Sequence, residues 1–455
     1  MALPVVSVAP GEQWRALRRT TGRARRALVS AWVGFYVDMV DIYLPVVALA
    51  PAIAYFQPGT LSSAEASLLF YTTFAATLMG RPLGAVLFGH FADTLGRRRL
   101  TLVSIAGFSA CTTAIGLLPG YAAWGAAAPL TLVLLRFVDG VFLGGEYTSA
   151  TPLAFEHCPP CARGLFGGVL MGAYALAYAT ISAGVLLLLA VMPAAAYETY
   201  GWRVPFLLGG VLGFVFLGYR ARVPESDLWR STPKEPRPLG TLVTRFRRDL
   251  AQVLLLMTGL WLVATSVVTV MPRLLTTELG RSDTWTTAVL LVSQLCVFCA
   301  FVGTGAASQL WGRRRTLVAG AVASVTVGMA AYVLVLSTGA GSWTLAWLVV
   351  ATQVVVLAVW GTVTSYCTER FRTAVRCSGF GIAYSVAVLP ASFYAVYMAA
   401  LADVMPYRYT QLVLLGVGAL LTVVGALLGP ETADLDLGQP DPEPEPVRGA
   451  LKSPA

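Results

Sequence analysis

Six ionisable side chains stand inside, or close to the ends of, apolar stretches of this 455-residue chain. They are Asp38, Asp41, Arg81, Arg136, Asp139 and Glu146. If these stretches cross a lipid bilayer, a central Asp or Arg costs about 2.5–3.5 kcal/mol, whereas each Leu returns only about 0.3–0.6 kcal/mol. Such side chains must face protein or water, pair with an opposite charge, or bind a proton. We therefore expect them to form a functional site.

The spacing of these residues places them on the inward faces of two helices. Asp38 and Asp41 are three residues apart and share one helix face. Asp139 and Glu146 are seven residues apart, and Arg136 precedes Asp139 by one turn. A simpler interpretation of Arg136 and Asp139 is that they neutralise each other within one helix.

Buried carboxylates beside guanidinium groups predict proton chemistry. A carboxylate that loses a neighbouring Arg binds a proton more readily, so a conformational change that moves the Arg can load and release a proton. We assign proton coupling to the four acids, Asp38, Asp41, Asp139 and Glu146. Arg136 is then their partner or a clamp for a substrate carboxylate, whose two oxygens fit the planar guanidinium. Arg81 has either of these roles or anchors its helix near a lipid headgroup.

The elements that must position these residues are long and apolar. Only 12% of the residues are charged and the mean hydropathy is +0.71, whereas soluble domains are about 25% charged. A membrane helix needs about 20 apolar residues. Twelve such segments run over residues 28–56, 66–88, 100–118, 129–155, 164–192, 202–219, 250–271, 284–307, 316–336, 343–366, 378–402 and 409–428. The sequence predicts an all-α, multi-pass membrane protein with twelve transmembrane helices.

The Lys and Arg residues behind the net charge of +9 are concentrated on one side of the predicted membrane protein. With both termini on one side, that side carries 26 of the 32 Lys and Arg residues, and the opposite side carries four. This asymmetry predicts that both termini are cytoplasmic. The basic balance is accounted for in this way, and we expect no nucleic-acid partner. The first apolar segment is too long for a signal peptide and has no cleavage pattern, so we interpret it as a membrane helix.

Two loops repeat along the chain and indicate a duplication. Gly89, Asp93, Gly96 and Arg97 align with Gly305, Gln309, Gly312 and Arg313 at an offset of 216, and Glu156 and Arg163 align with Glu369 and Arg376 at an offset of 213. The expected organisation is a basic tail (1–27), a six-helix bundle (28–221), a cytoplasmic linker (222–249), a second six-helix bundle (250–429) and a disordered tail (430–455). Two such repeats in the same orientation are typical of secondary transporters.

The repeated loop resembles the signature loop of the major facilitator superfamily. Other stretches resemble its metabolite:proton symporter branch, which carries dicarboxylates, tricarboxylates, shikimate, or proline and betaine. They are "GRPLGAVLFGHFAD", "LLRFVDGVFLGGE", "EHCPPCARG", "GWRVPFLL" and "ERFRTAVRCSGFGIAYS". The chain departs from that branch at four positions: Asp38 stands for a Glu, Asp139 for an amide, Arg372 for a Pro and Gln309 for an acid.

The resemblance implies a cytoplasmic gate made by the repeated residues. In this family the loop acid helps to latch the two halves through a helix end and neighbouring Arg residues, a role that falls to Asp93 here. Gln309 keeps hydrogen bonding but carries no charge, so we expect the second latch to be weaker. The full gate is Gly89, Asp93, Gly96, Arg97, Glu156, Arg163, Gly305, Gln309, Arg313, Glu369 and Arg376.

The second half lacks comparable interior charge and is expected to supply shape and hydrogen bonds. Its substrate-binding candidates are Trp261, Gln294, Gln353 and Tyr384, in addition to Arg81 and Arg136 of the first half. The seven Cys and two His residues give no metal-ligand pattern, and "CPPC" at 158–161 is interpreted as two incidental thiols in a reducing compartment.

These features predict a secondary active transporter of the plasma membrane. The favoured function is proton-coupled symport of a small organic anion or zwitterion by alternating access, by a monomer that uses the proton motive force and no cofactor. A proton-coupled exporter of a specialised metabolite or drug has the same fold and remains an alternative. A non-transporting receptor is a more distant one. A membrane enzyme is disfavoured because no metal constellation, nucleophile elbow or phosphate loop is visible.

Overall fold

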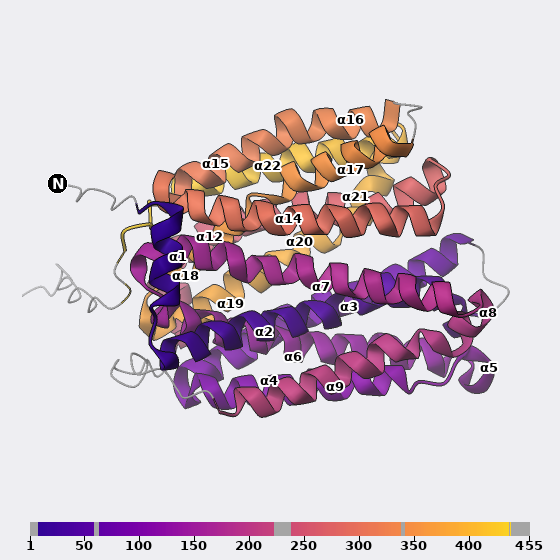
Figure 1. Ribbon diagram of the computed structural model, residues 1–455, viewed down its shortest axis with the longest axis horizontal. Helices are drawn as coiled ribbons and strands as arrows, with labels where there is room; N and C mark the ends of the chain where they lie inside the picture. The colour runs from indigo at the N-terminus through magenta and orange to yellow at the C-terminus, as the bar shows by residue number, and fades with distance from the viewer. Residues whose placement is uncertain (1–7, 59–62, 223–237, 338–341, 436, 438–455) are drawn as a thin grey trace, which may run out of the picture.

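The computed structural model describes residues 8–58, 63–222, 238–337, 342–435 and 437. Within these ranges the side chains of residues 50, 63–71, 93, 97, 149, 238, 273, 277, 283 and 342 lie outside the description. The described chain consists of helices and their connections, and most helices run along one long axis (Figure 1). The all-α fold expected from the sequence is confirmed.

The first half of the chain supplies six long helices. They are α2 (Gly22–Leu44), α3 (Ser63–Leu95), α4 (Arg97–Gly116), α6 (Ala127–His157), α7 (Arg163–Val191) and α9 (Arg203–Arg220). Three short helices lie among them: α1 (Pro10–Arg18), α5 (Tyr121–Trp124) and α8 (Ala194–Ala196). Helix α2 ends at Pro45, which has no N–H to continue the helical hydrogen bonds. The chain proceeds through a π turn (Pro45–Leu49) and a 3-10 turn (Ala50–Phe56).

The second half contains three interrupted spans. Helices α12 (Arg247–Val268), α14 (Asp283–Trp311) and α22 (Thr410–Leu428) are continuous. The interrupted spans are α15 (Arg313–Ala323) with α16 (Met329–Ser337), α17 (Ser342–Leu357) with α18 (Trp360–Arg370), and α19 (Arg376–Val386) with α20 (Val388–Ser392) and α21 (Tyr394–Ala402). Short helices α11 (Pro238–Thr244) and α13 (Met271–Arg273) flank α12. Pro390 lies in α20, where a missing N–H fits the break.

Eleven helical segments within the described ranges are long and apolar enough to cross a membrane. The remaining expected span, residues 66–88, lies inside the 33-residue helix α3. A helix of that length measures about 50 Å, more than the hydrocarbon thickness of a bilayer.

Glycines bring α3 and α6 together in the first half. A Cβ atom at Gly140 would collide with the backbone of Thr77, and one at Gly144 would collide with the backbone of Arg81. The Gly140-x-x-x-Gly144 spacing therefore permits direct contact between the two helix backbones. This packing holds Arg81 of α3 beside the charged face of α6.

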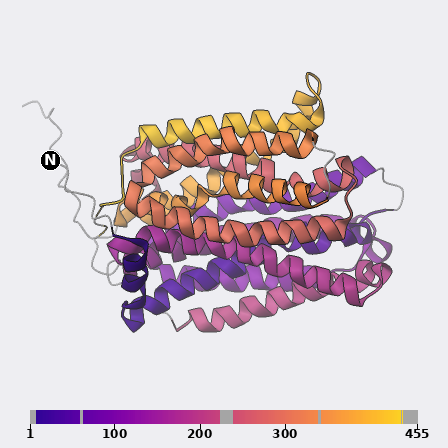
Figure 2. The same cartoon turned by 45° about the horizontal axis from the view of Figure 1, so that its top comes forward.

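The two halves approach each other most closely at one end of the bundle. Figure 1 shows α7 and α14 side by side near α1 and farther apart at the opposite end. A Cβ atom at Gly168 would meet the backbone of Phe301 and Gly305, whereas one at Gly172 would meet only the side chain of Phe298. We call the end that carries α1, the turn at Gly96 and residues 431–437 the termini end, and Figure 2 shows α1 there from a second direction.

Parts of the expected linker and tails are folded at the termini end. Leu242 of α11 is fully buried, and Thr432 and Leu437 of the expected disordered tail are buried as well. The Glu431 carboxylate accepts hydrogen bonds from the backbone N–H groups of Arg313 (2.7 Å) and Arg314 (3.1 Å) and caps α15. The first residues of the tail are thus part of the packed structure, while residues 223–237 and 438–455 lie outside the described ranges.

Candidate functional site

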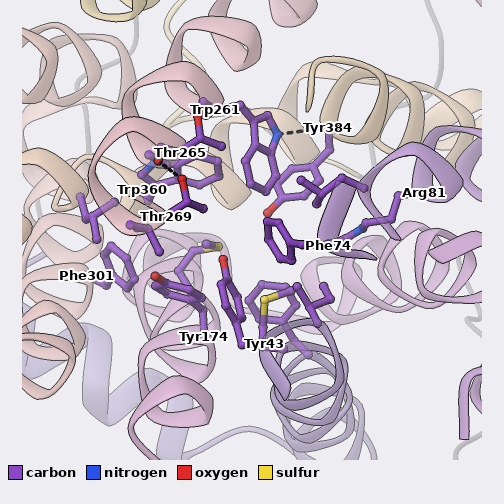
Figure 3. A pocket seen from close by; sticks show the side chains of 18 residues that line it. Tyr43, Phe74, Arg81, Tyr174, Trp261, Thr265, Thr269, Phe301, Trp360 and Tyr384 are labelled. Atoms are coloured by element: carbon purple, nitrogen blue, oxygen red, sulfur yellow. Dashed lines mark hydrogen bonds between the residues drawn. The ribbon is translucent and has the colours of Figure 1, made fainter. Parts of the chain in front are cut away.

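A cavity with about 640 Å³ of empty space lies between the two halves (Figure 3). Helices α2, α3 and α7 supply one wall, and α12, α14, α17, α18 and α19 supply the other. Most lining side chains are aromatic or aliphatic. The aromatic ones are Phe35, Tyr43, Phe74, Tyr174, Trp261, Phe301, Trp360 and Tyr384. A site shared by both halves at mid-length is where an alternating-access transporter binds its cargo.

Among the described residues that line the cavity, Arg81 is the single one that is charged at neutral pH. Its side chain points from α3 toward Phe74 and Tyr384 (Figure 3), and it is 97% buried, with 3% of its surface exposed. Nη2 of Arg81 lies 3.5 Å from Oδ2 of Asp38, which is itself fully buried. This nitrogen makes no hydrogen bond to the described residues, so the guanidinium keeps donors for a ligand.

Arg136 lies outside the cavity lining and joins two acids across helices α2 and α6. Its Nη1 is 2.9 Å from Oδ2 of Asp139 and 3.4 Å from Oδ2 of Asp41. The hydroxyl of Thr112 on α4 also donates to Asp41. All of these side chains are buried. Of the two roles expected for Arg136, the geometry therefore favours a partner of acids over a substrate clamp.

Glu146 belongs to a third charged group in the first half. Its carboxylate lies against α2 at Gly34, where a Cβ atom would collide with Oε1. Arg220 and Arg81 are the cations that act on it electrostatically. Arg220 is buried and donates to the hydroxyl of Ser30 at 3.0 Å. The sequence interpretation missed Arg220 because it directly precedes the basic linker; its place in the last turn of an apolar helix was the available signal.

The second-half candidates divide between the cavity and its surroundings. Trp261 and Tyr384 line the cavity, and Nε1 of Trp261 donates to the backbone oxygen of Tyr384 at 3.0 Å. Gln294 lies behind the wall, with Nε2 at 3.5 Å from the hydroxyl of Tyr174. Gln353 is fully buried away from the lining, and its amide has no hydrogen-bond partner among the described residues.

The gate candidates meet at the termini end and connect the halves. Arg376 of the second half pairs with Glu156 of the first half, with Nη1 and Oε1 2.7 Å apart and both side chains almost fully buried. Oε1 of Gln309 accepts from the backbone N–H of Gly164 at 3.0 Å, which is also a contact between halves. Arg313 then binds Gln309 at 2.7 Å within its own half.

The remaining gate residues support these contacts. Arg313 binds both carboxylate oxygens of Glu369, at 3.2 and 3.1 Å. Nη1 of Arg163 donates to the backbone oxygen of Leu435 at 2.6 Å, so the first half also contacts the C-terminal segment. Gly89 of α3 packs against the backbone of Ser378 in the other half.

The turns at the two repeated loops share one backbone geometry. Gly96 and Gly312 have φ values of 111° and 92°, which disfavour any other residue. Asp93 and Arg97 lie on α3 and α4, but their side chains are outside the described part of the chain.

The cysteines and acids give no metal site in the part of the chain described: no group of three His, Cys, Asp or Glu residues could hold an ion. Cys158 and Cys161 of the "CPPC" loop are both free. Burial raises the pKa of the Cys158 thiol, which keeps it protonated and unreactive at neutral pH.

Comparisons with known proteins agree with this arrangement. Residues 31–307 match the family model of the Major Facilitator Superfamily, and residues 230–442 match that of the Sugar (and other) transporter family. The inner membrane metabolite transport protein YhjE of Escherichia coli (strain K12) is 29% identical over 386 residues, covering 82% of this chain and 87% of that protein. The proline/betaine transporter of the same strain is 28% identical over 455 residues, covering 94% and 88%.

A solved structure shares the fold at low sequence identity. The proton:xylose symporter XylE bound to 6-bromo-6-deoxy-D-glucose has a TM-score of 0.70 at 16% identity, over 90% of this chain and 96% of that chain. The family and the curated relatives are transporters and not enzymes. Together with the eleven apolar helices, they identify a multi-pass protein of the plasma membrane. The chain belongs to the major facilitator superfamily and is a transporter of that family.

Proposed function

We propose that this transporter carries a small organic anion or zwitterion together with a proton, into the cell. The observation that carries the proposal is a charge count in the interior of the first half. Four buried carboxylates, Asp38, Asp41, Asp139 and Glu146, lie there with three buried guanidinium groups, Arg81, Arg136 and Arg220. The buried Arg163 of the same half lies apart from this cluster, at the termini end, where it donates to the backbone oxygen of Leu435. With every group ionised, the described cluster has four negative and three positive charges, and its net charge is −1. An unbalanced charge in a low-dielectric interior is costly, so one bound proton is favoured.

The position of Asp38 supports a specific coupling step. Asp38 pairs with Arg81, which is also the charged group of the cavity lining. A substrate carboxylate that binds Arg81 competes with Asp38 for the same cation. Asp38 then needs a proton to remain buried, so the anion and the proton bind together. Loss of the substrate on the other side of the membrane restores the ion pair and expels the proton.

The gate supports alternating access. The contacts of Arg376 with Glu156 and of Gln309 with Gly164 hold the halves together at the termini end. The distribution of Lys and Arg favours a cytoplasmic position for this end. These contacts must break when the halves rock to release cargo there. Their loss and recovery make the two-state element that transport requires.

The relatives point in the same direction. The E. coli proline/betaine transporter is named for zwitterionic cargo, and XylE is a proton symporter. The first name supports a substrate with a carboxylate, and the second supports coupling to a proton.

Uptake into proteoliposomes tests the proposal. Radiolabelled citrate, 2-oxoglutarate, shikimate, proline and betaine are offered with an acidic exterior and without a gradient. The expected result is accumulation of at least one compound only in the acidic exterior, abolished by a protonophore. Asp38→Asn should abolish accumulation while substrate exchange without a gradient persists. Asp403→Asn, which removes an exposed carboxylate at the opposite end, is the matched control. Accumulation driven by an acidic interior would instead establish the exporter alternative.

A further inference from the structure

The cavity lining limits which carboxylates fit. Arg81 is its one charged side chain, and the second guanidinium nearby, Arg136, is engaged by Asp41 and Asp139 outside the lining. A dicarboxylate or tricarboxylate would therefore bury a second anionic group without a cation. Burying an unpaired charge costs several kcal/mol. The lining thus favours a substrate with a single carboxylate.

The walls beyond Arg81 favour an apolar body. Tyr43 and Tyr174 meet edge to face in the first half, with ring centroids 5.2 Å apart. Trp261 and Trp360 do the same in the second half, at 4.9 Å. The hydroxyl of Thr265 already donates to the backbone oxygen of Trp261 at 2.9 Å. A sugar would bring several hydroxyls into this cavity and find few free partners, whereas a ring can pack between the aromatic faces.

The same lining disfavours a cationic body. Aromatic faces also attract quaternary ammonium groups. Here, however, Arg81 occupies the same cavity, and no lining side chain is an acid. A zwitterion can place its carboxylate on Arg81, but its cationic group then finds no acid among the described lining residues and lies near the Arg81 guanidinium. A neutral ring meets no such cost.

Trp360 adds one donor in the second half. It lines the cavity, is 96% buried with 4% of its surface exposed, and its Nε1 has no hydrogen-bond partner among the described residues. By contrast, the N–H of Trp261 is already used by Tyr384. A buried N–H without a partner is costly, so a ligand acceptor at this point is favoured.

We propose that the cavity binds a monocarboxylate with an uncharged ring, its carboxylate on Arg81 of the first half and a ring acceptor on the N–H of Trp360 of the second half. The inference rests on the proposed function and narrows its substrate class. Such a ligand contacts both halves, so its affinity depends on the position of one half relative to the other. The ring fills the space between the tyrosine and tryptophan pairs.

Isothermal titration calorimetry on the full chain in detergent tests this substrate class. The probes are cyclohexanecarboxylate, its uncharged amide, cyclohexane-1,4-dicarboxylate and glycine betaine. Cyclohexanecarboxylate should bind at least tenfold more tightly than each of the other three. Tighter binding of the dicarboxylate or of betaine, or no binding of cyclohexanecarboxylate, would overturn the proposal.

The tryptophan pair gives a matched control. Trp360→Phe removes the N–H that has no partner among the described residues but keeps an aromatic ring, and it should weaken 4-oxocyclohexanecarboxylate three- to tenfold more than it weakens cyclohexanecarboxylate. Trp261→Phe should change the affinity for both acids by the same factor. If Trp360→Phe changes the affinities for the two acids by the same factor, the assigned acceptor contact is refuted.

The titration needs no membrane and no gradient, so it separates this inference from the proposed function. If the ring acid binds but its uptake does not depend on the pH gradient, the proposed substrate class is supported and proton coupling is refuted. Gradient-driven accumulation of betaine, with no binding of the ring acid, would keep coupling and remove the substrate class.

Discussion

The two halves of this transporter have a similar helical frame but differ in what they bury. Apart from Glu156 and Arg163 at the termini end, the described first half buries four carboxylates and three guanidinium groups. The second half holds neutral polar side chains at comparable depth, such as Gln294, Gln353 and Thr265. Its buried charges, Arg313, Glu369 and Arg376, lie at the termini end instead. The repeat in the loops therefore preserves the gate, while the interior chemistry has become unequal.

This difference indicates that the two halves have different roles: the first holds the charged network, and the second shapes the cavity wall. Ionisable groups in a membrane interior must balance one another, so adding a charge to one half constrains every neighbour. Concentrating them in the first half leaves the second half free to vary the shape of the cavity wall. Arg81 is the point at which the charged network reaches the cavity.

The largest expected effect comes from breaking the charge balance of the first half. Arg136→Leu leaves Asp41 and Asp139 buried without their cation and should destabilise the protein by about 3–5 kcal/mol. Gln353→Leu is the matched change in the second half. It removes a buried amide that has no hydrogen-bond partner in the described chain, so it should be neutral or stabilising. Thermal unfolding in detergent measures both, and equal losses would contradict the comparison.

A smaller effect is expected at the contact between the halves. Glu156→Gln removes the charge partner of buried Arg376 and should favour opening at the termini end by about 1.5–3 kcal/mol. Neither Cys158 nor Cys377 forms a disulfide, and both are buried at this end, so their labelling reports opening. Burial holds the pKa of the Cys158 thiol above its usual value, so the closed state reacts slowly with maleimide.

The expected result is maleimide labelling of Cys158 and Cys377 roughly 10- to 150-fold faster in Glu156→Gln, read site by site by mass spectrometry. Cys111 is buried within the first half, beside Asp41 and Asp139 of the same half, and serves as the control. Unchanged rates at Cys158 and Cys377 would mean that this ion pair does not hold the halves together.

The helical frame and the charged faces could be predicted from local patterns. Long apolar runs fix the spans, and the three-residue spacing of Asp38 and Asp41 places both in the buried network. The Gly140-x-x-x-Gly144 contact follows from residue size. In contrast, the sequence could not say which Arg faces the cavity, since Arg81 and Arg136 differ only in how α3 and α6 pack against their neighbours.

Of the aromatic walls, Trp261 and Tyr384 were among the sequence candidates, but the other aromatic lining residues were not. Tyr43, Tyr174 and Trp360 come from three helices distant in sequence, and aromatic residues are common throughout membrane helices. The folded start of the C-terminal tail was missed because its composition is acidic and rich in proline. Its order derives from tertiary contacts, among them the cap that Glu431 provides to α15.

The smallest expected effect concerns the two repeated loop positions. Gln309 contacts the backbone of Gly164 and the guanidinium of Arg313, but it carries no charge. We therefore expect Asp93→Asn to impair transport far more than Gln309→Ala, and equal loss in uptake assays would refute the asymmetry. Gln309→Glu sharpens the test. A carboxylate there would turn the contact with Arg313 into an ion pair, and the hydrogen bond from the N–H of Gly164 at the N-terminus of α7 would become charge-assisted and roughly twice as strong. It should slow opening at the termini end and make the two latches more alike.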